Sequence, residues 1–161
     1  MTTQYFAYRI FLNQSPNEFV FKSKEDVFSE AFEMIEANKK NEFIDRGIDH
    51  ILYFIKKLGS DIYIMQLARK HTYEKPIAGE KKIEQVKDVD YPFIYLIFHL
   101  RFQIVLIQKD TTVFQSLDAV KSKLESFFIE KLNRINNYYK ALITFVIHTC
   151  YALFTRVYVL N

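Results

Sequence analysis

The chain has 161 residues, with 22 Lys and Arg against 19 Asp and Glu, which gives a formal net charge of +3. This length suits one domain that buries about 70% of its unfolded surface. The basic residues are spread along the chain, so no patch indicates binding to a phosphate backbone. Because 50% of the residues are hydrophobic and 17% are aromatic, we expect no long disordered stretch.

The single cysteine, Cys150, excludes an internal disulfide framework and is compatible with a reducing compartment. The first residues contain no basic segment followed by a small-residue cleavage site, so we expect no signal peptide and a cytoplasmic location. The richness in Ile, Lys, Asn, Phe and Tyr matches AT-rich codons. This composition suggests a low-GC bacterium, phage or plasmid as the source.

The first third of the chain predicts a strand and then a helix. Residues 4–12 form a strand pattern with apolar side chains on both faces, typical of a strand inside a sheet. After a turn, residues 19–21 suggest a short strand. Ser23 and Asp26 resemble a helix capping box. The following apolar stripe consists of Val27, Phe28, Ala31, Phe32, Met34 and Ile35.

The middle of the chain predicts four strands and a polar connection. Residues 51–67 form a hairpin pattern in which Gly59 supplies the turn with a positive φ. Residues 70–90 are polar and balanced in charge, so we expect a mobile loop there. Residues 92–108 are too long for one strand, and their β-branched and aromatic content disfavours a surface helix. We therefore expect two strands, at 93–99 and 102–108, that meet near Leu100.

A second helix is predicted from Ser116, its cap, to about Tyr138. Its apolar residues recur at spacings of three, four and seven. The order of elements predicts an α+β fold with a mainly antiparallel sheet of about five strands and two long amphipathic helices. We expect residues 1–140 to form a single α+β domain.

Residues 141–161 form an apolar C-terminal segment that must be buried somewhere. We expect a terminal strand or helix, packed in this domain or in an oligomer interface. One alternative is the truncated end of a longer protein. A membrane anchor is disfavoured because His148 and Arg156 lie inside the segment.

Candidate catalytic residues are few, and the sequence predicts no cofactor and no metal ligand. Asp45, Asp49 and Asp61 are weak candidates for a nuclease-like magnesium site, but a solvated connection between elements explains the same pattern. The four histidines are dispersed, and His148 with Cys150 is a poor match to a zinc site. Three glycines do not suffice for a phosphate-binding loop.

Aromatic and basic residues alternate at Tyr8-Arg9, at 53–57 and at 98–102, a pattern that single-stranded nucleic-acid platforms use. The small charge excess argues against such binding. The sequence therefore favours a non-enzymatic protein-interaction or assembly module, with another protein or a second copy as partner and no membrane contact. The alternatives are a fragment or N-terminal region of a larger nuclease-like enzyme, and a single-strand nucleic-acid binding domain.

Overall fold

The computed structural model of the chain describes residues 3–12, 23–80, 82–135 and 146–147. Their elements form a seven-stranded antiparallel sheet in the order β2-β3-β4-β7-β8-β1-β9, a separate two-stranded ribbon β5-β6, and two helices. The predicted α+β class with a mainly antiparallel sheet is confirmed. The expected number of about five strands was too low.

The bounds of the helices and strands are β1 (Tyr5–Arg9), α1 (Lys24–Asn38), β2 (Lys40–Asp45), β3 (Ile48–Leu58), β4 (Ile62–Arg69), β5 (His71–Ala78), β6 (Ile83–Asp90), β7 (Phe93–His99), β8 (Ile104–Gln108), α2 (Leu117–Ile135) and β9 (Val146–Ile147).

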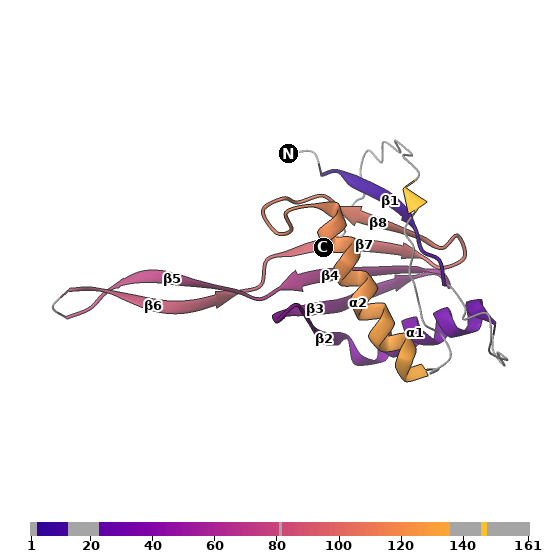
Figure 1. The fold of residues 1–161 in the computed structure, drawn as a ribbon, viewed down its shortest axis with the longest axis horizontal. Helices are drawn as coiled ribbons and strands as arrows, with labels where there is room; N and C mark the ends of the chain where they lie inside the picture. Colours follow the sequence, from indigo (N-terminus) through magenta and orange to yellow (C-terminus); the bar gives the residue numbers. More distant parts are fainter. Residues whose placement is uncertain (1–2, 13–22, 81, 136–145, 148–161) are drawn as a thin grey trace.

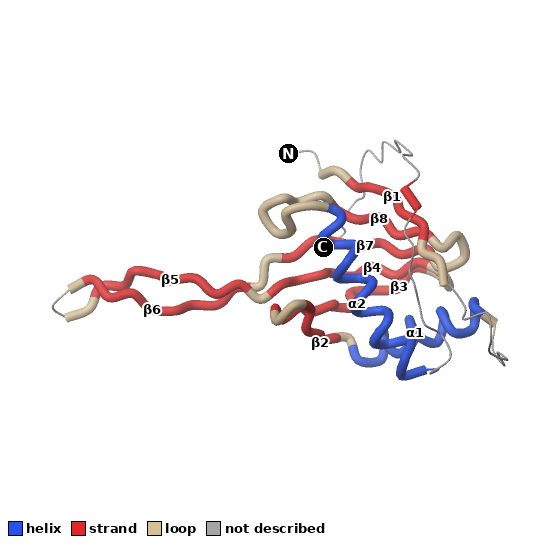
Figure 2. Tube along the Cα trace, viewed as in Figure 1, coloured by secondary structure: helices blue, strands red, loops and turns tan. Residues whose placement is uncertain are grey.

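Both helices lie on the same face of the seven-stranded sheet (Figures 1 and 2). The ring of Phe32 in α1 lies 5.0 Å from Tyr63 of β4 and 5.1 Å from Phe98 of β7, and Phe128 of α2 joins it at 5.5 Å. Edge-to-face rings at these distances stabilise a core beyond the area that they bury. The core is therefore the aromatic layer between the helices and this sheet face.

Local sequence signals explain where the helices begin. Ser23 accepts a hydrogen bond from the Asp26 backbone N–H at 3.1 Å, and the Asp26 carboxylate accepts one from the Ser23 N–H at 3.3 Å. This confirms the predicted capping box. In α2, the Ser116 hydroxyl accepts from the Ala119 N–H at 3.1 Å, which confirms the second cap. The predicted end of this helix, at 136–138, lies outside the described residues.

Strand β2 was missed because the acidic residues before the hairpin were interpreted as a connection. It pairs with β3 through the turn Arg46-Gly47, where φ is +50° and +76°. Two consecutive positive φ angles match the two-residue turn whose twist suits a hairpin. The predicted hairpin after it is confirmed, with φ of +61° at Gly59.

The mobile loop predicted for residues 70–90 is wrong. Residues 71–90, which we call the arm, form the antiparallel ribbon β5-β6, paired from His71 opposite Asp90 to Ala78 opposite Ile83. The Tyr73 hydroxyl donates to Asp88 at 3.2 Å, and the Gly79 N–H donates to the Lys82 carbonyl at 3.0 Å near the tip. Neither face of the arm is buried, so the apolar alternation that marks most strands is absent from its sequence.

Strand β1 lies inside the sheet, between β8 and β9, as its two apolar faces predicted. Val146 and Ile147 of the C-terminal segment pair with Arg9 and Tyr8. The other residues of this segment, and the short strand expected at 19–21, lie outside the described residues. Within the part of the chain that the structure describes, neither helix is both long and apolar enough to cross a membrane.

Candidate functional site

The three aspartates named as catalytic candidates lie at three separate places. Asp45 ends β2 on the helix-covered face, and Asp49 lies on the opposite face, since it pairs with the neighbouring residue Ile44. Asp61 lies in the turn beyond the far end of β3, a strand of 11 residues that spans about 35 Å. The structure therefore does not bring the three carboxylates into one site.

Two of these aspartates hold local roles. The Asp49 carboxylate forms an ion pair with Lys70 Nζ at 3.0 Å, where the arm joins the sheet. The Asp61 backbone carbonyl accepts from the Leu100 N–H at 2.8 Å and so joins two neighbouring turns. Among the described residues, no group of three or more His, Cys, Asp or Glu side chains is placed to hold a metal ion.

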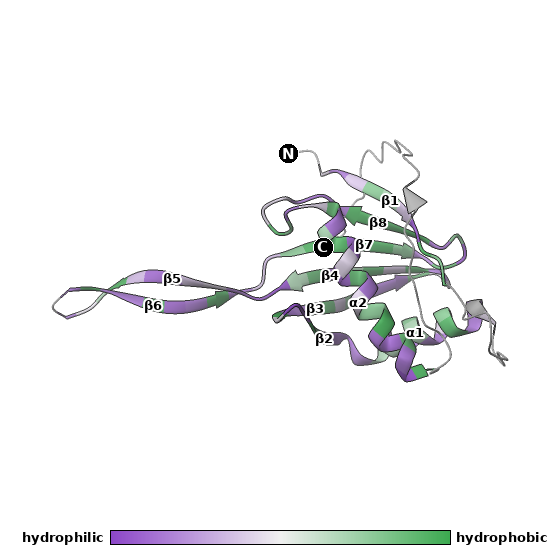
Figure 3. Cartoon of the chain, in the orientation of Figure 1, coloured by the Kyte–Doolittle hydropathy of each residue, from purple (hydrophilic) through white to green (hydrophobic). Residues whose placement is uncertain are grey.

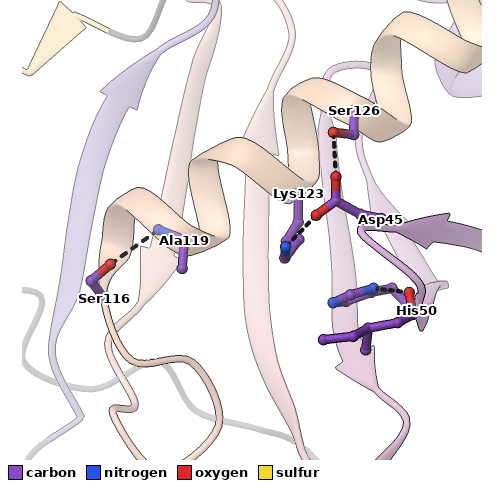
Figure 4. Close-up of polar contacts among 7 residues, drawn as sticks. Asp45, His50, Ser116, Ala119, Lys123 and Ser126 are labelled. Carbon is purple, nitrogen blue, oxygen red and sulfur yellow. Dashed lines mark hydrogen bonds and ion pairs between the residues drawn. The ribbon is translucent and has the colours of Figure 1, made fainter.

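Asp45 forms a polar cluster between the sheet and α2 (Figure 4). Its carboxylate accepts a hydrogen bond and ion pair from Lys123 of α2, and a 2.8 Å hydrogen bond from the Ser126 hydroxyl. His50 lies beside it on β3, and we call these four residues the Asp45 cluster. The tight turn at Arg46-Gly47 returns the chain, so that His50 and Asp45 face the same helix.

Helix spacing explains why Lys123 and Ser126 both reach one carboxylate. Residues three apart in a helix lie on the same side, and here they flank the buried side chains of Val120, Leu124 and Phe127. Neither residue was predicted from the sequence, because polar side chains at the border of an apolar stripe resemble ordinary solvated positions. Their i, i+3 spacing at that border was the available signal.

The electrostatics of Asp45 reflect its partners. Burial alone would raise the pKa of this carboxyl group, but the hydrogen bonds from Lys123 and Ser126 outweigh that effect and hold the pKa below its ordinary value. The side chains of Lys123 and Asp45 are only 13% and 10% exposed. The negative charge of Asp45 is therefore stabilised by Lys123 and Ser126 of α2.

His50 is almost fully buried and neutral. Its Nδ1–H donates to the Ile48 carbonyl at 2.8 Å, and its ring stacks on Phe43 at 5.3 Å and faces Phe114 at 6.3 Å. Burial lowers the pKa of His50 below its ordinary value, and the hydrogen bond to Ile48 opposes this shift in part. A neutral ring packed between two aromatic side chains is a core component.

The Asp45 cluster lacks the features of an activated nucleophile. A serine nucleophile requires a base that takes its proton, and a carboxylate whose pKa is depressed is a weak base. A small cavity of about 80 Å³ lies elsewhere and is lined by Ile10, Phe11, Leu12, Phe28 and Gln103. The cluster therefore holds α2 against the β2–β3 hairpin.

The aromatic and basic pattern expected as a nucleic-acid platform is divided by the fold. Tyr8 and Phe98 are buried on the helix-covered face, and Phe102 is exposed in the turn between β7 and β8. Tyr53 lies on the helix-free face, because it neighbours the buried Leu52 along β3. Arg9 and Lys56 of this set also lie on that face, since they pair with Ile104 and Ile64. The predicted platform consisted of residues adjacent in sequence. On a sheet face, however, neighbouring side chains come from different strands, because successive residues of one strand point to opposite faces.

Comparisons with known proteins supply no further assignment. No protein-family model, no curated protein and no solved structure matches this chain.

Proposed function

We propose that this chain is a non-enzymatic protein-interaction module and that the arm is its contact element. The observation that carries the proposal is the exposure of the arm, which projects away from the sheet (Figures 1 and 2). Every residue of β5 and β6 is exposed except Tyr73, which is partly buried. An isolated two-stranded ribbon is only marginally stable in water, so contact with a partner would stabilise it.

The arm carries apolar side chains that a partner would bury, at its tip and also along β6, where Val86 and Val89 are each 42% exposed. Ile77 is 41% exposed and Ile83 is 72% exposed. They lie on opposite faces of the ribbon, because Ile83 is opposite Ala78, the residue after Ile77. Full burial of such a side chain contributes about 1.5–3 kcal/mol. In Figure 3 the arm is coloured mostly as hydrophilic, with hydrophobic segments within it.

The charge of the arm favours a protein partner over a polyanion. Residues 71–90 contain four lysines against five carboxylates, so the arm has no excess of positive charge. Binding to nucleic acid depends on neutralising phosphates, and a surface without a positive excess does not do this. Exposed apolar side chains on a ribbon without excess positive charge are consistent with contact with an apolar site on another protein or on a second copy of this chain.

The test compares a tip variant with a matched shaft variant. Ile77→Lys with Ile83→Lys places charge at the tip, and Thr72→Lys adds the same kind of charge at the exposed base of the arm. We expect wild type and Thr72→Lys to form the same complex, either with themselves in sedimentation or with one partner identified by cross-linking and mass spectrometry. We expect the tip variant to lose that complex while its circular dichroism is unchanged.

Two results would overturn the proposal. One is a wild-type protein that sediments as a monomer and cross-links to no protein in an arm-dependent way. The other is a complex that the tip variant retains at wild-type affinity, since contact would then occur through another surface.

A further inference from the structure

The helix-free face of the sheet carries a row of alternating tyrosine and glutamine side chains. The row crosses five neighbouring strands and consists of Tyr53, Gln66, Tyr95, Gln108 and Tyr5. Register places Tyr53 opposite Gln66, Gln66 opposite Tyr95, and Gln108 opposite Tyr5. Gln108 is joined to Tyr95 because its side-chain carbonyl accepts the Tyr95 backbone N–H at 2.8 Å. We call these residues the tyrosine row.

The spacing within the tyrosine row is regular. Neighbouring strands lie about 4.8 Å apart, so the three tyrosines, on every second strand, repeat at about 10 Å with one amide between each pair. All five side chains are partly exposed. Phe93 extends the aromatic surface at Tyr95, with its ring 5.5 Å away and 43% of its surface exposed. Among the described residues, no helix covers this face.

The charges on this face suit an anionic ligand. Its strand residues include two carboxylates, Glu42 and Asp49, and each forms an ion pair, with Lys40 at 2.5 Å and with Lys70 at 3.0 Å. Arg9 and Lys56 also lie on this face, since they pair with Ile104 and Ile64. Neither has an ion pair within the described part of the chain. The charges of the two ion pairs cancel, so Arg9 and Lys56 leave the strand residues of this face with a net positive charge.

We propose that the tyrosine row binds the unpaired bases of single-stranded nucleic acid. Every base has a π-face that stacks on an aromatic side chain, and such binding tolerates any sequence. The amide of Gln66 offers hydrogen bonds to base edges between the stacking positions, and so does the amide NH2 of Gln108, whose carbonyl already accepts from Tyr95. A flat group that repeats along a charged chain matches rings that repeat across a sheet, whereas a protein surface presents no such repeat. This inference is independent of the arm.

The test is fluorescence anisotropy with labelled oligothymidylate and oligouridylate of about 12 nucleotides, a length within the usual site size. Tyr95→Ala removes the central ring, and Tyr95→Phe keeps its π-face. Tyr73→Ala, on the arm, is the control for loss of a tyrosine elsewhere. If Tyr95→Ala fails to fold by circular dichroism, Tyr53→Ala takes its place.

We expect binding by wild type to weaken about 5- to 150-fold in Tyr95→Ala, the range for one stacked base, and to persist in Tyr95→Phe and Tyr73→Ala. The stronger of the two oligomers then identifies DNA or RNA as the source of the bases. The proposal is overturned if wild type binds neither oligomer at up to about 100 μM, the weak limit of non-specific affinity. It is also overturned if Tyr95→Ala binds as wild type does, or if it disrupts self-association instead, which would make this face a protein interface.

Discussion

Lys123 of α2 forms a buried ion pair with Asp45 at the end of β2, which joins residues 78 positions apart in the chain. A buried ion pair contributes little net stability relative to apolar residues of the same size, because both charges lose their hydration. The pair matters because each buried charge is compensated by the other. Removal of one partner leaves the second charge buried without compensation.

We therefore predict that Lys123→Met lowers the free energy of unfolding by about 3–5 kcal/mol, the cost of breaking a buried pair. Urea denaturation followed by circular dichroism measures this change. The control is Arg134→Ala, which breaks the exposed pair of Arg134 with Glu130 on the same helix and should cost at most about 1 kcal/mol.

The double variant Asp45→Leu with Lys123→Met separates an unpaired charge from lost packing. We expect it to recover much of the stability that Lys123→Met loses, because neither charge remains buried. A double variant as unstable as the sum of its single variants would assign the loss to side-chain packing.

The packing of α2 gives a second prediction. Leu124 is completely buried between α2 and the sheet, whereas Ile129 on the same helix is 38% exposed. Leu124→Ala should lower the free energy of unfolding by about 2–5 kcal/mol, because it removes buried methyl groups and leaves a cavity. Ile129→Ala should cost far less by the same denaturation measurement. Equal losses in the two variants would contradict the packed face described here.

Local patterns allowed both helices to be predicted, because capping residues and apolar stripes act over a few positions in the chain. The apolar residues of α2 recur at spacings of three and four, and Val120, Leu124 and Phe128 among them are buried. The fold class followed from the order of elements. Capping residues and apolar stripes therefore predict where an element lies in the chain and which of its faces is buried.

The missed features depend on contacts between distant residues. β2 has only six residues, of which three are exposed, so its alternation is short and mixed with charges. The arm has no buried face, and its strands are held by pairs such as His71 with Asp90. The Asp45 cluster and the tyrosine row both require the register of the strands or the rotation of α2, which no single segment encodes.

The turn between β2 and β3 gives a third prediction. Gly47 has a φ of +76°, and a methyl group there would meet no atom within 4 Å. Any cost of Gly47→Ala therefore comes from the backbone, and it should be about 1–2 kcal/mol, the penalty for the left-handed conformation. Gly47→Asn should cost less, because asparagine adopts this conformation more readily. Thermal or urea unfolding of both variants checks the order, and a larger loss in Gly47→Asn would contradict it.

The last prediction concerns pH. Burial lowers the pKa of His50 in the folded protein, whereas in the unfolded chain it is near 6.5, about the ordinary value. The unfolded chain therefore binds a proton more readily, and the stability contributed by neutral His50 is complete above about pH 6.5. It is lost as the pH falls toward the folded-state pKa. Asp45 acts in a lower window, because its depressed pKa contributes stability that is lost only below about pH 4.

His50→Phe isolates this effect, since it removes the titrating group and keeps a ring that can stack on Phe43 and Phe114. We expect the free energy of unfolding of wild type to fall between about pH 7.5 and pH 5.5, on both sides of the histidine pKa. The decrease should be clearly smaller in His50→Phe. Because the comparison is between two proteins with the same remaining histidines, their titration cancels. The same pH dependence in both proteins would show that His50 titrates alike in the folded and unfolded states, against its burial between the two phenylalanines.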